Sequence, residues 1–293
     1  MSIKKSVGER VFDVFNYLFL TLFALCTFLP FVYVVAASFA TEAQVSTGEL
    51  FLIPDEFSLD AYRYIFANNS ILRALSVSVY VTVVGTIVNL LFTTTFAYSL
   101  SRRDLIGREI ILNGIIFTMM FSGGMIPTYI LVKNLGLLNS LWSLILPGAI
   151  SAFNLIVVKN FFQELPGELM ESARIDGCSD LGVFFKIVLP LSLPVLATFG
   201  LFYAVGHWNA YFSALLYIND STKWPLQVLL RQLIMLSQGS IGDESQLDPT
   251  FVKPPEQTVK MAIIVVGTVP ILMVYPFLQK HFTKGVLVGA LKG

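Results

Sequence analysis

The residues with the most specific spacing lie in a polar segment, residues 165–190, which separates two apolar stretches. The segment reads LPGELMESARIDGCSDLGVFFKIVLP. Pro166 suits the first turn of a helix, and Gly177 suits a left-handed helix end. Ser179 or Asp180 can cap a following helix. The spacing therefore predicts a short helix, a break, and a second helix that runs into the next apolar stretch.

This predicted hairpin offers the chemistry of a docking surface. Ser172 and Ala173 give the first helix a face of small side chains that can sit closely in a groove. Leu165, Leu169 and Ile175 supply apolar anchors beside that face. The alternative is an ordinary amphipathic loop that packs on its own helices.

A second group of candidates consists of neutral polar and aromatic side chains within or beside apolar stretches. Such groups suit a hydroxyl-rich solute such as a sugar. They equally suit hydrogen bonds between helices, which contribute about 0.6 kcal/mol each in membranes. The candidates for a solute pathway are Asn89, Tyr98, Asn113, Tyr129, Asn154, Trp208 and Asn209.

Several other kinds of chemistry lack the residues they need. The apolar stretches contain no Asp, Glu, Lys or Arg, which disfavours an ion-coupled transporter with a buried charge relay. His207 is the one titratable exception, and its place beside Trp208 is typical of an interfacial histidine. The sequence has no G-x-x-x-x-G-K-[ST] nucleotide loop. Cys26 and Cys178 form neither a disulfide framework nor a metal-ligand cluster, so no metal site is predicted.

The composition indicates a membrane protein. Hydrophobic residues make up 55% of the 293 residues and charged residues 13%, against about 25% in ordinary soluble domains. The mean hydropathy is +0.74. The net charge of zero gives no basic field for nucleic acid.

Six stretches are uncharged, at residues 14–41, 74–101, 110–132, 134–158, 187–219 and 261–279. Each is long enough to cross a bilayer, which takes about 20 apolar residues in a helix. We predict an all-α membrane protein with spans at about 12–38, 74–101, 110–132, 141–158, 187–208 and 261–279. Lys and Arg concentrate on the cytoplasmic side of membrane proteins. Placing both termini in the cytoplasm puts twelve of the 19 basic residues inside. Residues 159–186 then form a cytoplasmic loop and residues 209–260 an external loop region.

Glycines and prolines interrupt four of these spans. They occur at Gly123-Gly124 and Pro127, at Pro147-Gly148, at Pro190 and Pro194, and at Pro270 and Pro276. Such residues kink or break helices. Kinked helices often line cavities, although simple packing irregularity is an equal alternative.

The polar hairpin resembles the EAA loop of the membrane subunits of bacterial ABC importers. The family pattern E-A-A-x3-G-x9-I-x-L-P matches here from Glu171 to Pro190, with Ser172 in place of the second-position alanine. Further matches to the MalG-like carbohydrate branch are MIPTY at 125–129, GLLNS at 136–140, Pro147-Gly148, Trp208-Asn209 and the tail at 279–293. Within that branch the chain is most similar to subunits for oligosaccharides and acidic polysaccharide fragments such as alginate.

The resemblance implies a type I ABC importer permease, a single permease domain over residues 1–293, in a bacterial cytoplasmic (inner) membrane. Its hairpin would be a coupling helix that docks on a cytoplasmic ATPase subunit. The implied coupling residues are Leu165, Leu169, Glu171, Ser172, Ala173, Asp176, Gly177, Leu189 and Pro190.

The same resemblance implies a set of partners. They are a second, homologous permease subunit, two ATPase subunits that bind ATP and Mg, and an external solute-binding protein. This chain itself would bind no cofactor and catalyse no reaction. The alternatives are an ABC permease for another solute class, an ion-coupled secondary transporter, and a membrane enzyme with paired carboxylates or a metal cluster.

Overall fold

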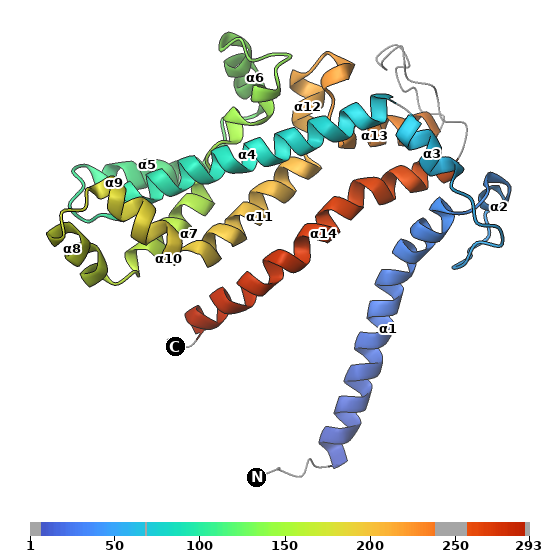
Figure 1. Ribbon diagram of the computed structural model, residues 1–293, viewed down its shortest axis with the longest axis horizontal. Helices are drawn as coiled ribbons and strands as arrows, with labels where there is room; N and C mark the ends of the chain where they lie inside the picture. Colours follow the sequence, from blue (N-terminus) through green and yellow to red (C-terminus); the bar gives the residue numbers. More distant parts are fainter. Residues whose placement is uncertain (1–6, 68, 238–256, 291–293) are drawn as a thin grey trace. The chain divides into compact units, whose positions relative to one another are not determined.

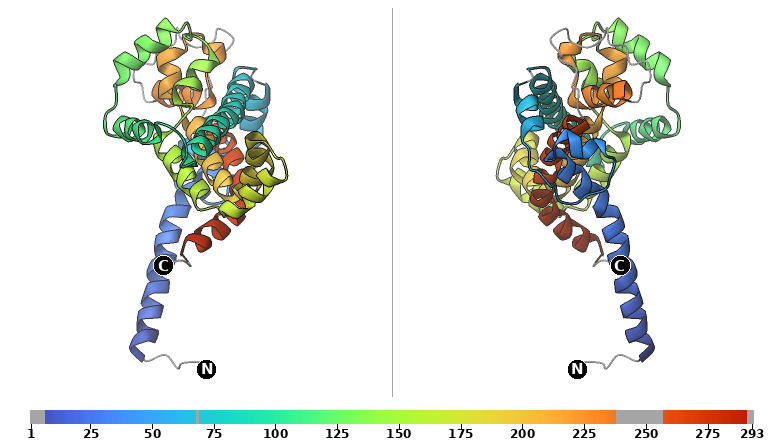
Figure 2. Two further views of the ribbon diagram at one scale, coloured as in Figure 1. Left: turned by 90° about the vertical axis from the view of Figure 1, so that its left-hand side faces the viewer. Right: turned by 90° about the vertical axis from the view of Figure 1, so that its right-hand side faces the viewer.

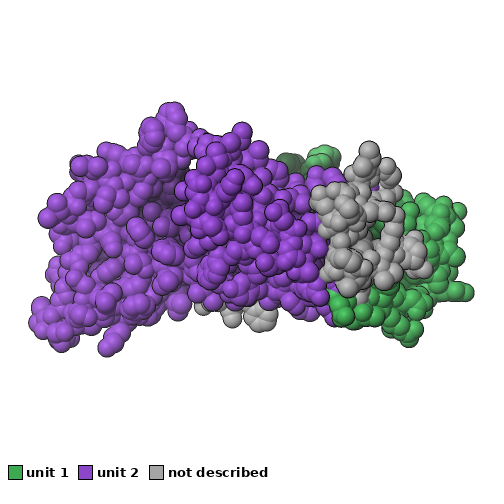
Figure 3. All heavy atoms as spheres, turned by 90° about the horizontal axis from the view of Figure 1, so that it is seen from above, with its two compact units in different colours: residues 1–69, 251–268 green, residues 70–250, 269–293 purple. Residues whose placement is uncertain are grey.

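The computed structural model describes residues 7–67, 69–237 and 257–290, and every regular element in these residues is helical. Figure 1 shows these helices, which fall into two compact units (Figure 3). One unit comprises residues 1–69 and 251–268, and the other comprises residues 70–250 and 269–293. The stretch 238–256 of the predicted external loop region lies outside the described residues.

The first unit is built on α1 (Val7–Ser38), α2 (Glu42–Ser46), α3 (Asp60–Ala67) and the beginning of α14 (Gln257–Ala290). A small core of Ala37, Ala40 and Val45 joins α1 to α2. The Glu42 carboxylate accepts hydrogen bonds from the backbone N–H groups of Gln257 (3.0 Å) and Thr258 (3.2 Å). The first N–H groups of a helix point away from its own carbonyls, so Glu42 caps α14 from a distant part of the sequence.

The second unit is organised around α4 (Asn69–Ser101), a continuous helix of 33 residues. Val158, Phe162, Val183, Val188 and Phe199 contribute to its main core, together with Ala97 and Leu100 of α4. The other helices of this unit are α5 (Arg108–Met120), α6 (Met125–Asn134), α7 (Ala152–Gln163), α8 (Gly167–Ile175), α9 (Asp180–Val183), α10 (Leu189–Leu191), α11 (Leu193–Asn209), α12 (Phe212–Tyr217) and α13 (Leu226–Ser237).

Three of the predicted spans are bent helix pairs in the structure. The chain turns by 119° between α5 and α6, by 53° between residues 141–148 and α7, and by 81° between Asp180–Leu191 and α11. Each bend falls at a predicted break, at Gly123-Gly124, Pro147-Gly148 or between Pro190 and Pro194. The span predicted at 187–208 is therefore not one straight helix. In contrast, α14 continues through Pro270.

Two helices have the length and hydropathy of an uninterrupted span, Gly8–Ser38 and Asn69–Ser101. Counting each bent pair as one span raises the number to five, and the apolar part of α14 at Gln257–Met273 is a further, shorter candidate. The chain is thus a multi-pass membrane protein, and the number of six spans remains a prediction.

A left-handed asparagine joins two loop segments of the second unit. Asn139 has a φ of 58°. Its N–H donates to the carbonyl of Tyr217 at 2.7 Å, and its side-chain oxygen accepts from the N–H of Asp220 at 3.0 Å. Tyr217 also stacks on Tyr129, with 6.3 Å between ring centroids. As a result, α6 and α12 lie side by side in each view (Figures 1 and 2).

Candidate coupling hairpin and membrane pathway

The hairpin predicted from the sequence is present. Helix α8 covers Gly167–Ile175, with Pro166 immediately before its first residue. Gly177 has a φ of +84°, which confirms the left-handed helix end. The Cys178 N–H donates to the Ala173 carbonyl at 2.9 Å, as in a Schellman motif. Of the two capping candidates, Ser179 takes the role, because its hydroxyl accepts from the Gly182 N–H at 3.2 Å.

Side chains of the hairpin have different surroundings. Leu165, Met170 and Ala173 pack against the core of the second unit. Other apolar side chains are exposed, with Leu169 at 45% and Ile175 at 86% exposure. The structure thus separates Ala173, which faces inward, from Ser172, which is exposed. The exposed members of the predicted coupling set are Leu169, Glu171, Ser172, Asp176 and Gly177, together with Pro190 at the far end of the loop. Leu189 is partly buried against the core.

Charged side chains connect this hairpin to the end of α4. Asp180, the first residue of α9, forms ion pairs with Arg102 at 2.6 Å and with Arg174 at 3.2 Å. Arg102 also binds Asp104 at 2.8 Å. The hydrogen bonds with Asp104 raise the pKa of Arg102 above its ordinary value, and Arg102 in turn lowers the pKa of the Asp104 carboxyl.

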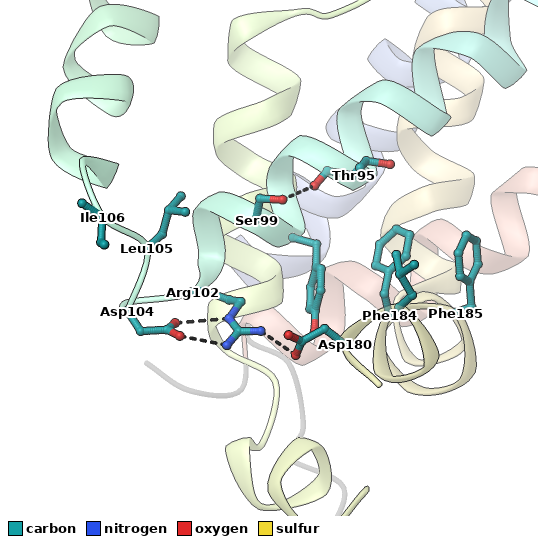
Figure 4. Close-up of a pocket in the computed structure, with 11 residues that line it drawn as sticks. Thr95, Ser99, Arg102, Asp104, Leu105, Ile106, Asp180, Phe184 and Phe185 are labelled. Atoms are coloured by element: carbon teal, nitrogen blue, oxygen red, sulfur yellow. Dashed lines mark hydrogen bonds and ion pairs between the residues drawn. The ribbon is translucent and has the colours of Figure 1, made fainter. Parts of the chain in front are cut away.

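These ion pairs border an open cavity of about 560 Å³ (Figure 4). Phe184 and Phe185 line it from the turn of π-helix that follows α9, and Leu105 and Ile106 line it from the loop after α4. Its walls are mainly apolar, and its charges are already paired within the chain.

The structure places the predicted pathway residues in different surroundings. Asn89 is fully buried, and its amide nitrogen donates to the carbonyls of Gly148 (2.6 Å) and Ala149 (3.0 Å). These carbonyls lie at the helix break before α7. The Asn89 side-chain oxygen lies 2.6 Å from Nε2 of His207. Since turning the amide over would set oxygen against two carbonyl oxygens, His207 must donate through Nε2.

A second contact one turn away joins the same helices. The Thr93 and Tyr203 hydroxyls lie 2.8 Å apart, and the Ser151 N–H donates to the Tyr203 hydroxyl at 3.4 Å. Asn89, Thr93, His207 and Tyr203 thus form a polar network that ties α4 to α11 and to the start of α7. We call these four residues the central network.

The remaining pathway candidates are scattered over the second unit. Tyr98 borders the cavity near Arg102, Trp208 is buried beside an apolar pocket, and Asn154 is buried in the first turn of α7. Tyr129 stacks on Tyr217. Asn113 and Asn209 are exposed, and the Asn209 amide donates to the carbonyl of Val205.

Sequence reasoning missed the partners of Asn89. Gly85 leaves room for one of these partners, because a Cβ placed there would lie 2.5 Å from His207 Nε2. A glycine one turn before a buried asparagine was the available signal. In the described part of the chain, no group of His, Cys, Asp and Glu side chains could hold a metal ion.

Comparison with known proteins decides the family. Residues 2–288 match the model of the binding-protein-dependent transport system inner membrane component. The chain belongs to this family. It is 60% identical over 285 residues to the polygalacturonan/rhamnogalacturonan transport system permease protein YtcP of Bacillus subtilis (strain 168), covering 97% of this chain and 99% of that protein. It is 59% identical to protein LplC of the same organism, covering 97% and 96% of the two chains.

A solved structure supports the same assignment. The chain is similar to a chain in the crystal structure of a bacterial ABC transporter involved in the import of the acidic polysaccharide alginate. The TM-score is 0.86 at 32% identity, over 96% of this chain and 100% of that one. The protein is thus the permease component of a sugar or oligosaccharide ABC importer, a transport subunit with the type I permease fold.

Proposed function

We propose that this permease forms half of the membrane pathway of an ATP-driven importer for acidic oligosaccharides, and that its α8 hairpin receives the driving motion from an ATPase subunit. The observation that carries the coupling role is the set of exposed apolar side chains on the α8–α9 hairpin. Leu169, Ile175 and Leu181 are 45%, 86% and 70% exposed on a hairpin whose inner face is firmly packed. Large exposed apolar side chains on a rigid support are typical of a protein interface.

The dimensions of α4 support a transmembrane arrangement of the two loop regions. Arg102, just after α4, contacts the hairpin, and Ser78 near its other end accepts a hydrogen bond from Leu226 N–H at 2.8 Å. The 24 positions between them correspond to about 36 Å of helix, slightly more than the ~30 Å hydrocarbon layer. The hairpin and the segment around Leu226 therefore suit opposite faces of the bilayer. We infer six spans, cytoplasmic termini and an inner-membrane location on this basis and from the distribution of basic residues.

The assembly proposed for this chain has five further components. They are a homologous second permease subunit, two ATPase subunits that bind ATP and Mg, an external binding protein and the surrounding lipid. One hairpin and one set of spans make half of a symmetric pathway. The external segment that includes α12 and α13 is the proposed contact for the binding protein.

The proposed solute class rests on what two similar proteins are named for. One is named for polygalacturonan and rhamnogalacturonan, and the similar crystal structure concerns alginate. Both names denote polymers that contain uronic acid. The apolar stretches of this chain hold no Lys or Arg. We therefore propose that neutral hydrogen-bonding groups of this chain contact the sugar hydroxyls, and that carboxylates are recognised by partner subunits.

Uptake of labelled trigalacturonate into liposomes that hold the complete complex tests this proposal. We expect uptake that requires ATP on the ATPase side, with little uptake of neutral maltotriose. Preferred uptake of maltotriose contradicts the acidic solute class. Uptake driven by an ion gradient without ATP favours a secondary transporter instead.

Substitutions in the hairpin test the coupling role separately. Gly177→Val forces a β-branched residue into a left-handed conformation, although the surrounding space is open. We expect the complex to assemble and to hydrolyse ATP, with loss of most transport. Glu171→Lys should act similarly through charge. Gly167→Val is the matched control, because Gly167 also faces open space and has no positive φ. Full transport by Gly177→Val contradicts the coupling role.

A further inference from the structure

The hairpin has a second connection to the membrane helices besides the polypeptide chain. Asp180 binds Arg174 in the last turn of α8 and Arg102 just after the end of α4, both through Oδ1. Figure 4 shows the Arg102 guanidinium between Asp104 and Asp180. One carboxylate thus joins the candidate coupling helix to the longest helix of the second unit.

The route along the chain is less direct. From α9 it passes through a turn of π-helix at Phe184–Val188 and then through the 81° bend before α11. Helix α4, by contrast, runs without a break over 33 residues from the point where Arg102 leaves it. A displacement applied at its end therefore moves the whole helix.

The Arg102 side chain is held ready for this contact. Its Nε and Nη2 atoms donate to the two carboxylate oxygens of Asp104, at 3.2 and 2.8 Å. This two-point contact fixes the plane of the guanidinium and leaves Nη1 directed at Asp180. Asp104 is two residues along the chain from Arg102, so the arrangement is local.

We propose that Asp180 and Arg102 are positioning residues, which hold α8 in a fixed orientation to the end of α4 so that movement of the hairpin is passed to α4. The inference rests on the proposed docking of the hairpin on an ATPase subunit. The hairpin keeps its own fold without this pair, since the Gly177 turn and the Ser179 cap use other atoms. Exposed ion pairs contribute little to folding stability. Loss of this pair should therefore weaken the coupling of transport to ATP hydrolysis and leave the stability of the protein nearly unchanged.

The test uses the complete complex in liposomes and measures labelled trigalacturonate imported per ATP hydrolysed. Asp180→Asn should lower this ratio by up to about fivefold, the upper end of what an exposed ion pair contributes. The amount of ATPase subunit that copurifies should stay unchanged. Asp180→Glu keeps the carboxylate and should restore most of the ratio. Asp60→Asn is the matched control, because Asp60 forms an exposed ion pair with Arg63 far along the sequence from the hairpin.

Gly177→Val, measured in parallel, separates the two proposals. If Gly177→Val uncouples transport and Asp180→Asn matches the wild type, hairpin docking stands and the inference is overturned. If neither variant changes the ratio, hairpin docking is wrong and the inference falls with it. A reduced amount of copurified ATPase in Asp180→Asn also overturns the inference, because Asp180 then acts in docking.

A distance measurement provides a readout that does not depend on transport. Spin labels at Glu168 on α8 and Ser99 on α4, both exposed, report the orientation of the two helices. We expect one narrow distance distribution in the wild type and a broader one in Asp180→Asn. An unchanged narrow distribution in the variant contradicts the positioning role.

Discussion

Two polar connections join α4 to later parts of the chain, and they differ in chemistry. At the end of α4, Arg102 and Asp180 form an ion pair whose side chains are 28% and 60% exposed. In the middle of α4, the central network joins it to α11 with neutral groups only, and Asn89 and Thr93 are fully buried there. The charged connection is in contact with water, and the neutral one is not.

This difference follows from the surroundings of the two connections, which are water for the ion pair and the bilayer for the central network. Charged side chains are costly inside a bilayer, whereas neutral hydrogen-bonding groups are tolerated there. An exposed ion pair can open because water replaces each partner. The buried network opens only if two backbone carbonyls lose their donor. We therefore interpret the central network as a fixed joint that stabilises the fold, and the Arg102–Asp180 pair as a contact that orients α8 and contributes little to folding stability.

Asn89→Leu should have the largest effect on this comparison. It removes the donor for the Gly148 and Ala149 carbonyls and the acceptor for His207 in one step. We expect a loss of about 2 kcal/mol in the free energy of unfolding in detergent. Denaturant titration of the purified complex measures this loss.

Asn113→Leu is the control for that experiment, because Asn113 is exposed on α5. The control should unfold like the wild type. If Asn89→Leu is as stable as the control, the network is not a fixed joint, and Asn89 returns as a candidate for solute contact.

Gly85→Ala tests the same joint by steric pressure. The added Cβ would lie 2.5 Å from His207 Nε2, so α4 and α11 must separate or His207 must turn away from Asn89. Overpacking of this kind should lower the stability by about 1.5 kcal/mol. Gly114→Ala on α5 is matched, because nothing lies within 4 Å of a Cβ there. Equal thermal stability of the two variants contradicts close packing at Gly85.

Tyr203→Phe removes a single hydrogen-bonding group from the network. The hydroxyl contacts Thr93 and the N–H of Ser151, while the ring stays in the core. The average membrane hydrogen bond predicts a loss of about 0.6 kcal/mol. Tyr129→Phe, at a half-buried ring stacked on Tyr217, is the control. A loss as large as that of Asn89→Leu would mean that the network acts through Tyr203.

The sequence was sufficient for features that depend on neighbouring residues. The left-handed conformation of Gly177 follows from its place after a short helix, and the bends at Gly123-Gly124 and Pro147-Gly148 follow from residue type. The family could also be predicted, because the EAA pattern depends on spacing within one segment. Its carbohydrate branch could be predicted from the further short matches, such as MIPTY at 125–129.

The hydrogen-bond partners of Asn89 could not be predicted in the same way. The sequence shows that a buried amide is present, but not that the break at Pro147-Gly148 leaves two carbonyls opposite it, 59 and 60 residues away. The pairing of Asp180 with Arg102 over 78 residues has the same origin. Long-range partners depend on how helices pack. A single sequence does not show which polar groups of distant segments will meet.

Acidification tests the charged connection at the end of α4, and its expected effect is the smallest of those described. Arg102 lowers the pKa of Asp104 through its hydrogen bonds, so this contribution is present above the ordinary carboxyl pKa and is lost as the pH falls through the lowered value. Below about pH 4, Arg102 should lose its fixed plane, and the spin-label distance between Glu168 and Ser99 should broaden slightly. Asp104→Asn should be broadened to that extent already at pH 7. If acid broadens Asp104→Asn as much as the wild type, the response does not come from the orientation of Arg102 by Asp104.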